Sequence, residues 1–367
     1  MAVYLNGNEV EEGQALASAA ELLGKAKLPL IAGLMTDVAG AEAALDLAET
    51  VGGVIDHAAG GGMARANRLM REAGSTPVSL GEVRNRSDLV IVLGKAPLEA
   101  DPALLEKIFP AKQKLPRPGA EPRRLITMGC KPKTLPETVE TTAIDIRKVD
   151  LMTAIGMLAA AIQHHPFGDT RKALPKALAE AAERFREAAF SVFVYSPEEL
   201  PEPVLHTVLD MVRSLCGKAR AGTYTVPVHG NGEGVNLCSV WTCGLPVRTS
   251  FAHGNPVHDA WRYDTHRMIE DGEADALLWI DAFGEKKAEA PKGVPTILLA
   301  NPGTVKPDAA DIVIEIAKPG SDHDAALYLP EISGLGMVRA SASGSGLPSV
   351  AQILGALTDR LNTTEAA

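Results

Sequence analysis

Two glycine-rich segments hold the residues best suited to ligand binding. The first, DHAAGGGMAR at 56–65, brings polar side chains and glycines together: His57, Gly60, Gly61, Gly62 and Arg65. Successive glycines let backbone amides approach a ligand closely or adopt a positive φ. The segment is therefore either a tight packing turn or a cradle for an anion such as a carboxylate. It lacks the G-x-G-x-x-G spacing of a nucleotide fingerprint.

The second segment, PVHGNGEGVN at 227–236, combines His229 and Asn231 with three glycines after an apolar run that predicts a strand. Ligands of open parallel sheets bind beyond the carboxyl ends of strands, so this segment is either a ligand-facing loop or a set of simple turns. If two lobes face each other, the loops at 57–65 and 229–236 are expected to lie across one cleft.

The four cysteines predict neither a disulfide framework nor a metal site. They are widely spaced, at Cys130, Cys216, Cys238 and Cys243. Only the last two are close together, and their C-x4-C spacing is looser than the C-x2-C of zinc ribbons, with no second pair nearby. We expect packed thiols in a reducing compartment.

A histidine-containing segment at 251–267 also invites a metal interpretation, because it contains His253, His258, Asp259 and His266. A helical zinc pair needs histidines four residues apart, and Pro256 prevents a helix from joining the first two. Loop hydrogen bonding is the expected role. The chain also lacks G-x-S-x-G and a cysteine near a histidine, so we predict no catalytic residue, metal or cofactor of its own.

Alternating strand and helix patterns position these segments in an α/β fold. An apolar run at 28–34 leads through Asp37 and Gly40 into a helix, followed by a strand at 54–56. This order predicts a βαβ unit and a parallel sheet. Further apolar runs predict buried strands at 87–97, 123–131, 141–146, 295–300 and 310–316.

The length of 367 residues exceeds the size at which single cores stop growing and predicts two domains. We expect a first α/β domain at 1–165 plus 321–367 and a second, inserted domain at 175–320. The last helix has an apolar face but no sheet of its own, so it is expected to fold back onto the first domain. Residues 111–124, with three prolines, predict a surface loop or a partner contact.

Composition excludes several classes of partner. The formal charge of -10 disfavours nucleic acid and anionic lipid, and only 4% aromatic residues argue against base or sugar stacking. No apolar run approaches the ~20 residues that span a bilayer, and the N-terminal segment lacks signal-peptide features. A cytoplasmic protein is expected.

Several segments together resemble the B subunit of formylmethanofuran dehydrogenase, a member of the molybdopterin oxidoreductase superfamily. The resemblance covers nearly the whole chain and rests on KLPLIAGLMTDVAGAEAALDLAETVGGVIDHAAGGG, SLGEVRNRSDLVIVLGKAPLEADP, MIEDGEADALLWIDAF and ADIVIEIA. In that family a run like LGEVRNRSDLVIVLG carries the central strand of the first α/β domain. The resemblance implies two related parallel-sheet, Rossmann-like (αβα) domains, the second inserted into the first.

Two departures from this family remove its cofactor ligands. Its active members begin with a cysteine cluster that binds a [4Fe-4S] centre, whereas the first cysteine here is Cys130. They also place a metal-ligating Cys or selenocysteine just after the strand that corresponds to GGVIDH, where this chain has Gly60–Gly62. The resemblance therefore implies no cluster and no molybdenum or tungsten pterin.

The same departures occur in the B subunits of the formyltransferase/hydrolase complexes of methylotrophic bacteria, which this chain is similar to. Such complexes move a formyl group from tetrahydromethanopterin to a methanofuran-like carrier and hydrolyse it to formate. The resemblance implies a non-catalytic scaffold subunit without activity of its own. It also implies as partners a formyltransferase subunit, a zinc amidohydrolase subunit and a third subunit.

Two alternatives belong to other classes. An active formylmethanofuran dehydrogenase subunit would need metal ligands that the sequence does not display. A thiamine-diphosphate enzyme fragment is the other alternative, because PLIAGL and LAETVGG also resemble the central domain of those enzymes. Their diphosphate motif, GDG followed by Asn, is absent.

Overall fold

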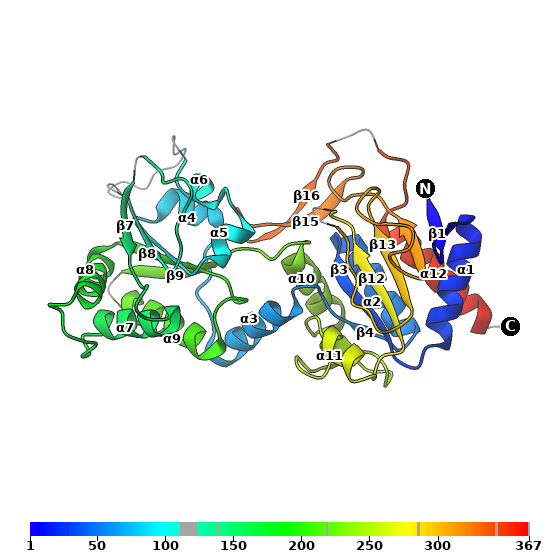
Figure 1. Cartoon of the computed structure of the whole chain (residues 1–367), viewed down its shortest axis with the longest axis horizontal. Coiled ribbons are helices and arrows are strands. Elements are labelled where there is room, and N and C mark those ends of the chain that lie inside the picture. The colour runs from blue at the N-terminus through cyan, green and yellow to red at the C-terminus, as the bar shows by residue number, and fades with distance from the viewer. Residues whose placement is uncertain (111–122, 138, 218, 285–286, 342–343, 366–367) are drawn as a thin grey trace. The chain divides into compact units, whose positions relative to one another are not determined.

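The computed structural model of this chain describes residues 1–110, 123–137, 139–217, 219–284, 287–341 and 344–365. These residues form two compact units (Figure 1). Unit 1 consists of Met1–Ala64, Val228–Tyr328 and Gly334–Ala367. Unit 2 consists of Arg65–Pro227 and Leu329–Ser333. The chain enters unit 2 within helix α3 (Gly60–Ala73).

Among the described residues, unit 1 forms a nine-stranded mixed sheet in the order β11-β10-β4-β3-β12-β13-β14-β1-β2. The five central strands are parallel: β4 (Val54–Ile55), β3 (Pro29–Met35), β12 (Ala276–Asp281), β13 (Thr296–Ala300) and β14 (Ile312–Glu315). Short antiparallel strands extend both edges: β10 (Thr249–Ser250), β11 (Val257–His258), β1 (Val3–Leu5) and β2 (Asn8–Glu9). Burial on both faces explains why the central strands are almost entirely apolar.

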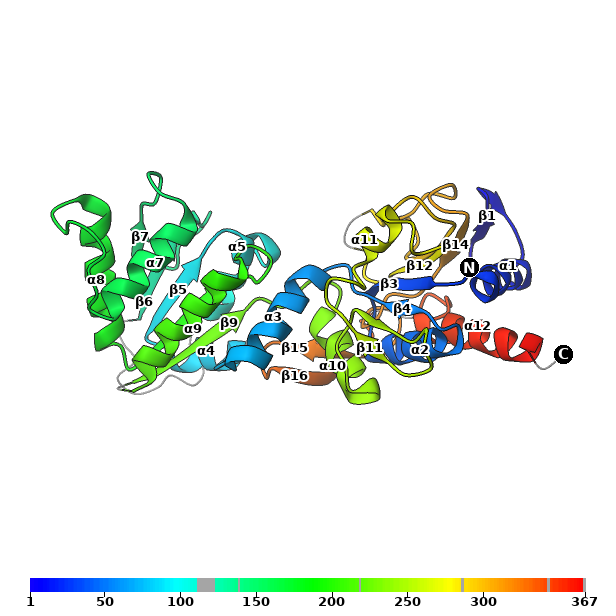
Figure 2. The ribbon, with the colours of Figure 1, turned by 90° about the horizontal axis from the view of Figure 1, so that it is seen from below.

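Successive strand residues in unit 1 point to opposite faces of the sheet, and both faces are covered. Ile31 and Leu278 pack on the face that carries four helices: α1 (Glu12–Lys25), α2 (Val38–Thr50), α10 (Gly232–Cys243) and α12 (Val350–Glu365). Leu30 and Leu277 pack on the other face, together with Met268 of α11 (Thr265–Glu270). Figure 2 shows α11 and α2 on opposite sides of the strands of unit 1.

Unit 2 is built on a five-stranded sheet within the described residues, in the order β7-β6-β5-β8-β9, and every pair in it is parallel. These strands are β7 (Glu140–Ile144), β6 (Arg124–Met128), β5 (Leu89–Leu93), β8 (Phe190–Tyr195) and β9 (Arg220–Thr225). Leu89 and Ile91 face one layer of helices, formed by α7 (Leu151–Ile162), α8 (Ala173–Glu187) and α9 (Glu202–Cys216). Val90 and Val92 face α4 (Leu80–Arg86) and α6 (Leu104–Ile108).

The remaining elements are short. Helix α5 (Ala96–Ala100) follows β5, and β15 (Ala325–Leu329) pairs with β16 (Gly334–Val338) as a two-stranded sheet. Within the described residues, no helix is long and apolar enough to cross a membrane.

The predicted α/β fold with parallel sheets is confirmed. Apolar runs predicted as strands coincide with β3, β5, β6, β7, β13 and β14. The expected βαβ unit is also present, because β3 and β4 pair in parallel on either side of α2 in the sequence. The last helix, α12, packs against α1 and α2, as expected from its apolar face. The loop predicted at 111–124 lies, up to residue 122, outside the described residues.

The expected domain boundaries are wrong, although one unit is inserted into the other. The structure divides at Ala64 and Val228, whereas we expected domains at 1–165 plus 321–367 and 175–320. The physical reason is strand pairing: β8 pairs with β5 rather than with β12, while β12 pairs with β3. The connector near 165–175 therefore joins α7 to α8, which share one core in unit 2.

Candidate functional site

Unit 1 offers a ligand position at the carboxyl end of its parallel strands. Strand β4, which comes next in the sequence, pairs with one side of β3. Strand β12, which follows the inserted unit, pairs with the other side of β3. Ligands of open α/β sheets bind where the strand order reverses in this way. The residues that follow β3 and β4 there are Thr36 and Asp37, and Asp56 and His57.

The segment that contains His229 and Asn231 packs directly on this end of β3. A side chain at Gly230 would place its Cβ 2.3 Å from Cγ of Met35, so only glycine fits. The Asn231 Nδ2 group donates to the Thr36 carbonyl oxygen at 2.9 Å, and Asn231 Oδ1 accepts from the Tyr328 amide at 2.8 Å. The expected ligand-facing loop is therefore bonded to the strand end itself.

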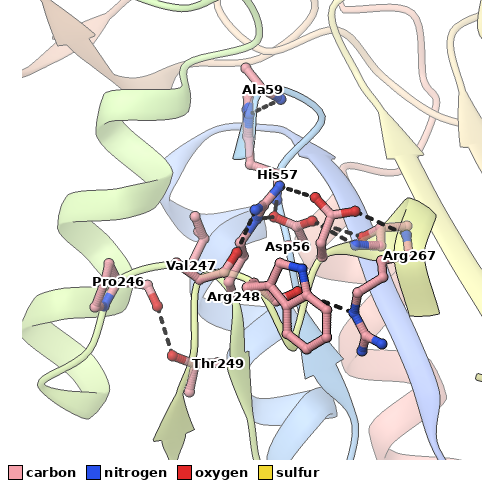
Figure 3. Close-up of polar contacts among 12 residues, drawn as sticks. Asp56, His57, Ala59, Pro246, Val247, Arg248, Thr249 and Arg267 are labelled. Carbon is pink, nitrogen blue, oxygen red and sulfur yellow. Dashed lines mark hydrogen bonds and ion pairs between the residues drawn. The ribbon is translucent and has the colours of Figure 1, made fainter. Parts of the chain in front are cut away.

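The imidazole of His57 is a buried group at this edge, with 3% of its surface exposed. Its Nδ1 accepts a hydrogen bond from the Ala59 amide at 3.0 Å (Figure 3). Its Nε2 is buried and has no partner with hydrogen-bond geometry in the described part of the chain. Burial lowers the pKa of His57 to about 4. The Gly230 backbone raises this pKa, but its effect is weaker than that of burial. The ring is therefore neutral near pH 7.

A buried ion-pair network lies beside His57 and was not predicted from the sequence. Asp56 Oδ1 accepts from the His57 amide at 2.9 Å and from Nε of Arg248 at 3.3 Å. Asp56 Oδ2 accepts from the amide and the hydroxyl of Thr265, both at 3.0 Å. Arg248 also forms an ion pair with Asp264. Asp56 and Arg248 are labelled in Figure 3. Burial raises the pKa of Asp56, and Arg248 and Thr265 oppose that rise.

This network explains one of the three successive glycines. Helix α3 begins at Gly60, where an added Cβ would lie 2.2 Å from Asp56 Oδ1 and 3.0 Å from Nε of Arg248. At Gly61 the nearest atom, Nη2 of Arg248, would be 3.9 Å away, which is an ordinary contact. Gly60 is thus required by close packing, which is the first of the two roles considered for the segment.

The predicted site residues do not all gather. His57, Gly60, Gly61, Gly62, His229 and Asn231 belong to unit 1, whereas Arg65 belongs to unit 2. Arg65 donates from Nε to the Pro197 carbonyl at 2.7 Å and from Nη2 to the Glu198 carbonyl at 3.0 Å. The expectation that the loops at 57–65 and 229–236 face each other from two lobes is wrong. Both loops belong, up to Ala64, to one unit, and His57 Cε1 lies 3.1 Å from the Cβ position of Gly232.

The residues at this edge do not fit a molybdenum or tungsten pterin. In the active members of the family that the sequence resembles, the protein ligand to such a metal is Cys or selenocysteine. The thiols of the chain are at Cys130, Cys216, Cys238 and Cys243, and none of these follows β4. The Asp56 carboxylate already accepts from Arg248 and Thr265, and Gly60 has no room for a side chain.

Four of the other residues considered for metal binding make local contacts, whereas His253 and His266 are exposed. The Cys238 thiol faces the Val38 carbonyl at 3.8 Å, and the Cys243 thiol donates to the Ser239 carbonyl at 3.2 Å. His258 Nδ1 lies 3.0 Å from the Arg248 carbonyl oxygen. Asp259 accepts from the amides of Trp261 and Arg262 at 2.9 and 2.8 Å, which is the loop hydrogen bonding expected for this segment.

The side chain of Asn231 provides a test of how the loop is held. Asn231→Ala is expected to lower the free energy of unfolding by about 2 kcal/mol, because the Thr36 carbonyl and the Tyr328 amide, both in partly buried hydrogen bonds, lose their partner. Alanine also tolerates the positive φ of 62° poorly. Asn231→Gly, which accepts that φ, is expected to cost less. Urea unfolding of both variants measures this, with the exposed Asn255→Ala as control; equal stability of Asn231→Ala and the control would contradict it.

Comparison with known proteins gives relatives that align with most of this chain. No protein-family model matches the chain. It is 27% identical over 330 residues to the B subunit of the formyltransferase/hydrolase complex Fhc of Methylorubrum extorquens, covering 89% of this chain and 88% of that protein. It is 25% identical over 340 residues to the B subunit of the tungsten-containing formylmethanofuran dehydrogenase 2 of Methanocaldococcus jannaschii, covering 87% of this chain and 76% of that protein.

A solved structure matches over the full length. It is a chain in the X-ray crystal structure of the formyltransferase/hydrolase complex FhcABCD from Methylorubrum extorquens in complex with methylofuran. The TM-score is 0.87 and the sequence identity 26%, with 100% of both chains covered.

Proposed function

We propose that this chain is the B subunit of a formyltransferase/hydrolase complex, because it is a homologue of the B subunit of the complex Fhc. Its partners in this proposal are a formyltransferase subunit, a zinc amidohydrolase subunit and a third subunit. The complex converts formyl-tetrahydromethanopterin to formate through a methanofuran-like carrier in one-carbon oxidation. The observation that carries the proposal is the structural match, which spans both chains in full.

Within the complex we assign this chain a scaffold role rather than a catalytic one. The support comes from the carboxyl edge of unit 1. The Asp56 carboxylate is neutralised by Arg248 and hydrogen-bonded by Thr265, so it has little capacity left as an acid or base. The loop around Asn231 is bonded to the end of β3 and occupies the space beyond it. Both features are those of groups that stabilise the unit, which supports the scaffold role.

The experiment is assembly of the complex with unaltered and with altered forms of this chain. We expect the chain to co-purify with the three partner subunits from native extract, in a particle larger than its own 38.6 kDa. Complexes that contain His57→Gln or Arg65→Ala should retain formyl transfer and hydrolysis close to the unaltered complex. The exposed His253→Gln serves as the matched control.

Two different outcomes would contradict different parts of the proposal. A monomer in native extract, shown by light scattering, contradicts membership of a complex. Loss of turnover in an intact complex with His57→Gln contradicts the scaffold role but leaves the membership standing. Elemental analysis adds an independent measurement, since stoichiometric molybdenum or tungsten in the purified chain would favour the formylmethanofuran dehydrogenase reaction instead.

A further inference from the structure

Unit 2 contains a pocket at the carboxyl edge of its parallel sheet. The pocket has a volume of about 600 Å³ and is lined by side chains from 95–109 and 130–136. Lys95 comes two residues after β5, and Cys130 comes two residues after β6, the parallel strand beside it. The position between β5 and β8, where the strand order reverses, is filled by the Glu199 carboxylate, which accepts from the Lys95 amide at 3.1 Å. The open part of this ligand-binding edge is therefore the pocket beyond β5 and β6.

The floor of the pocket is apolar and is held in place by the core of unit 2. Leu105 and Phe109 are each only 5% exposed and belong to the core that packs on one face of the sheet. Leu98 and Cys130 are half-buried and pack against the same core. The guanidinium carbon of Arg123 lies 4.4 Å from the centre of the Phe109 ring, which fixes that ring further. The chain thus forms the floor by itself, as most small-molecule sites are formed before the ligand enters.

The charged side chains that line the pocket are exposed and carry an excess of positive charge. They are three lysines and two glutamates: Lys95, Lys131, Lys133, Glu99 and Glu106. Lys95 forms an ion pair with Glu99, with Nζ 3.6 Å from Oε1. Lys131, Lys133 and Glu106 form no ion pair within the described residues, so one ammonium charge is left over. This local sign is opposite to the formal charge of the chain, which is -10.

Volume, floor and charge together define the class of molecule that fits. Pockets of about 300–1,000 Å³ hold small molecules, and this one lies within that range. Rings or an alkyl chain suit the apolar floor, and Leu135, which is 49% exposed, adds apolar surface to the lining. An acidic group suits the unpaired Lys131 and Lys133, whereas Glu106 disfavours a second negative charge on the same molecule.

We propose that this pocket of unit 2 is a binding site for a small organic anion. The apolar part of the anion lies on the floor formed by Leu98, Leu105 and Phe109, and its single acidic group lies beside Lys131 and Lys133. A carboxylate and a phosphate offer the same charge and the same acceptor oxygens to these lysines. All of these residues belong to unit 2, and the inference does not depend on the proposed function.

The experiment is a fluorescence titration of the full chain with anilinonaphthalene sulfonate, a ring system that carries one anionic group. Phenylnaphthylamine has the same rings without the sulfonate and serves as the neutral probe. Both probes should bind, because both fit the apolar floor. At least one of octanoate and octyl phosphate should displace the sulfonate probe, and the one that does so at the lower concentration identifies the preferred acidic group. Octanol at the same concentrations should displace it less.

Matched variants test whether the probe lies in this pocket. Lys131→Gln and Lys133→Gln should each weaken binding of the sulfonate by about threefold and leave binding of the neutral probe unchanged. Glu106→Gln should strengthen binding of the sulfonate by a similar factor. Lys148→Gln, which changes an exposed lysine of unit 2 outside the pocket, should alter neither probe. All four side chains are exposed, so these variants should fold as the unaltered chain does.

Three results would overturn the proposal. The first is that the unaltered chain binds neither probe. The second is that the double variant Lys131→Gln/Lys133→Gln binds the sulfonate as tightly as the unaltered chain. The third is that octanoate and octyl phosphate displace the sulfonate no better than octanol does.

Discussion

Arg248→Met is expected to lower the free energy of unfolding by about 4 kcal/mol, because it leaves two carboxylates at the carboxyl edge of unit 1 without their cation. The Arg248 side chain is only 10% exposed and that of Asp56 only 4% exposed. An uncompensated charge at such a depth costs far more than the loss of a surface pair. Guanidinium or urea unfolding of the isolated chain at pH 7 measures the effect.

The effect of Arg248→Met should depend on pH in a defined direction. Burial already raises the pKa of Asp56, and removal of the guanidinium raises it further. A carboxyl with a raised folded-state pKa contributes its stability below its unfolded pKa of about 3.9 and loses it as the pH rises through the folded value. The variant should therefore be closest to the unaltered chain near pH 4 and furthest from it at pH 7.

Arg262→Met is the matched control for Arg248→Met, because Arg262 lies on the same segment but is exposed. It should change stability by no more than about 0.5 kcal/mol. If Arg248→Met is no less stable than Arg262→Met at pH 7, the buried network contributes nothing to the fold and the two carboxylates are accommodated in another way.

Local pattern was sufficient to predict most strands but not the sheet to which each belongs. The run at 28–34 nearly coincides with β3, and the run at 87–97 contains β5, because buried parallel strands leave a continuous apolar signal. Neither run indicates which strand it pairs with in the sheet. Strand β5 pairs with β8, about 100 residues later, and β3 pairs with β12 across the whole insertion. The domain boundaries depend on these pairings and were therefore wrong.

The candidate site shows the same division between local and long-range information. The position of Asp56 and His57 after a strand is visible in the sequence, and so is the run of glycines. The partners of Asp56 are not, since Arg248 is 192 residues away in the sequence and Thr265 is 209 residues away. Arg65 shows that residues close in the sequence need not share a site. It lies three residues after Gly62 yet is hydrogen-bonded to Pro197 and Glu198 in unit 2.

The second large effect concerns His57 and acid pH. Burial holds the pKa of His57 at about 4, compared with about 6.5 for an unfolded histidine, so the unfolded chain binds the proton more tightly. A group with a lowered folded-state pKa contributes its stability above the unfolded value and loses it as the pH falls through the folded value. Between pH 7 and pH 4 the chain should lose about 3 kcal/mol through this residue alone.

The variant His57→Gln isolates that loss, because glutamine keeps an oxygen that can accept from the Ala59 amide but cannot be protonated in this range. Its free energy of unfolding should fall less steeply than that of the unaltered chain between pH 7 and pH 4, and the gap between the slopes gives the contribution of His57. His253→Gln changes an exposed imidazole and should follow the unaltered curve. Parallel curves for His57→Gln and the unaltered chain would mean that the imidazole becomes protonated in the folded state, which its unpartnered Nε2 allows only if the edge of unit 1 opens to water.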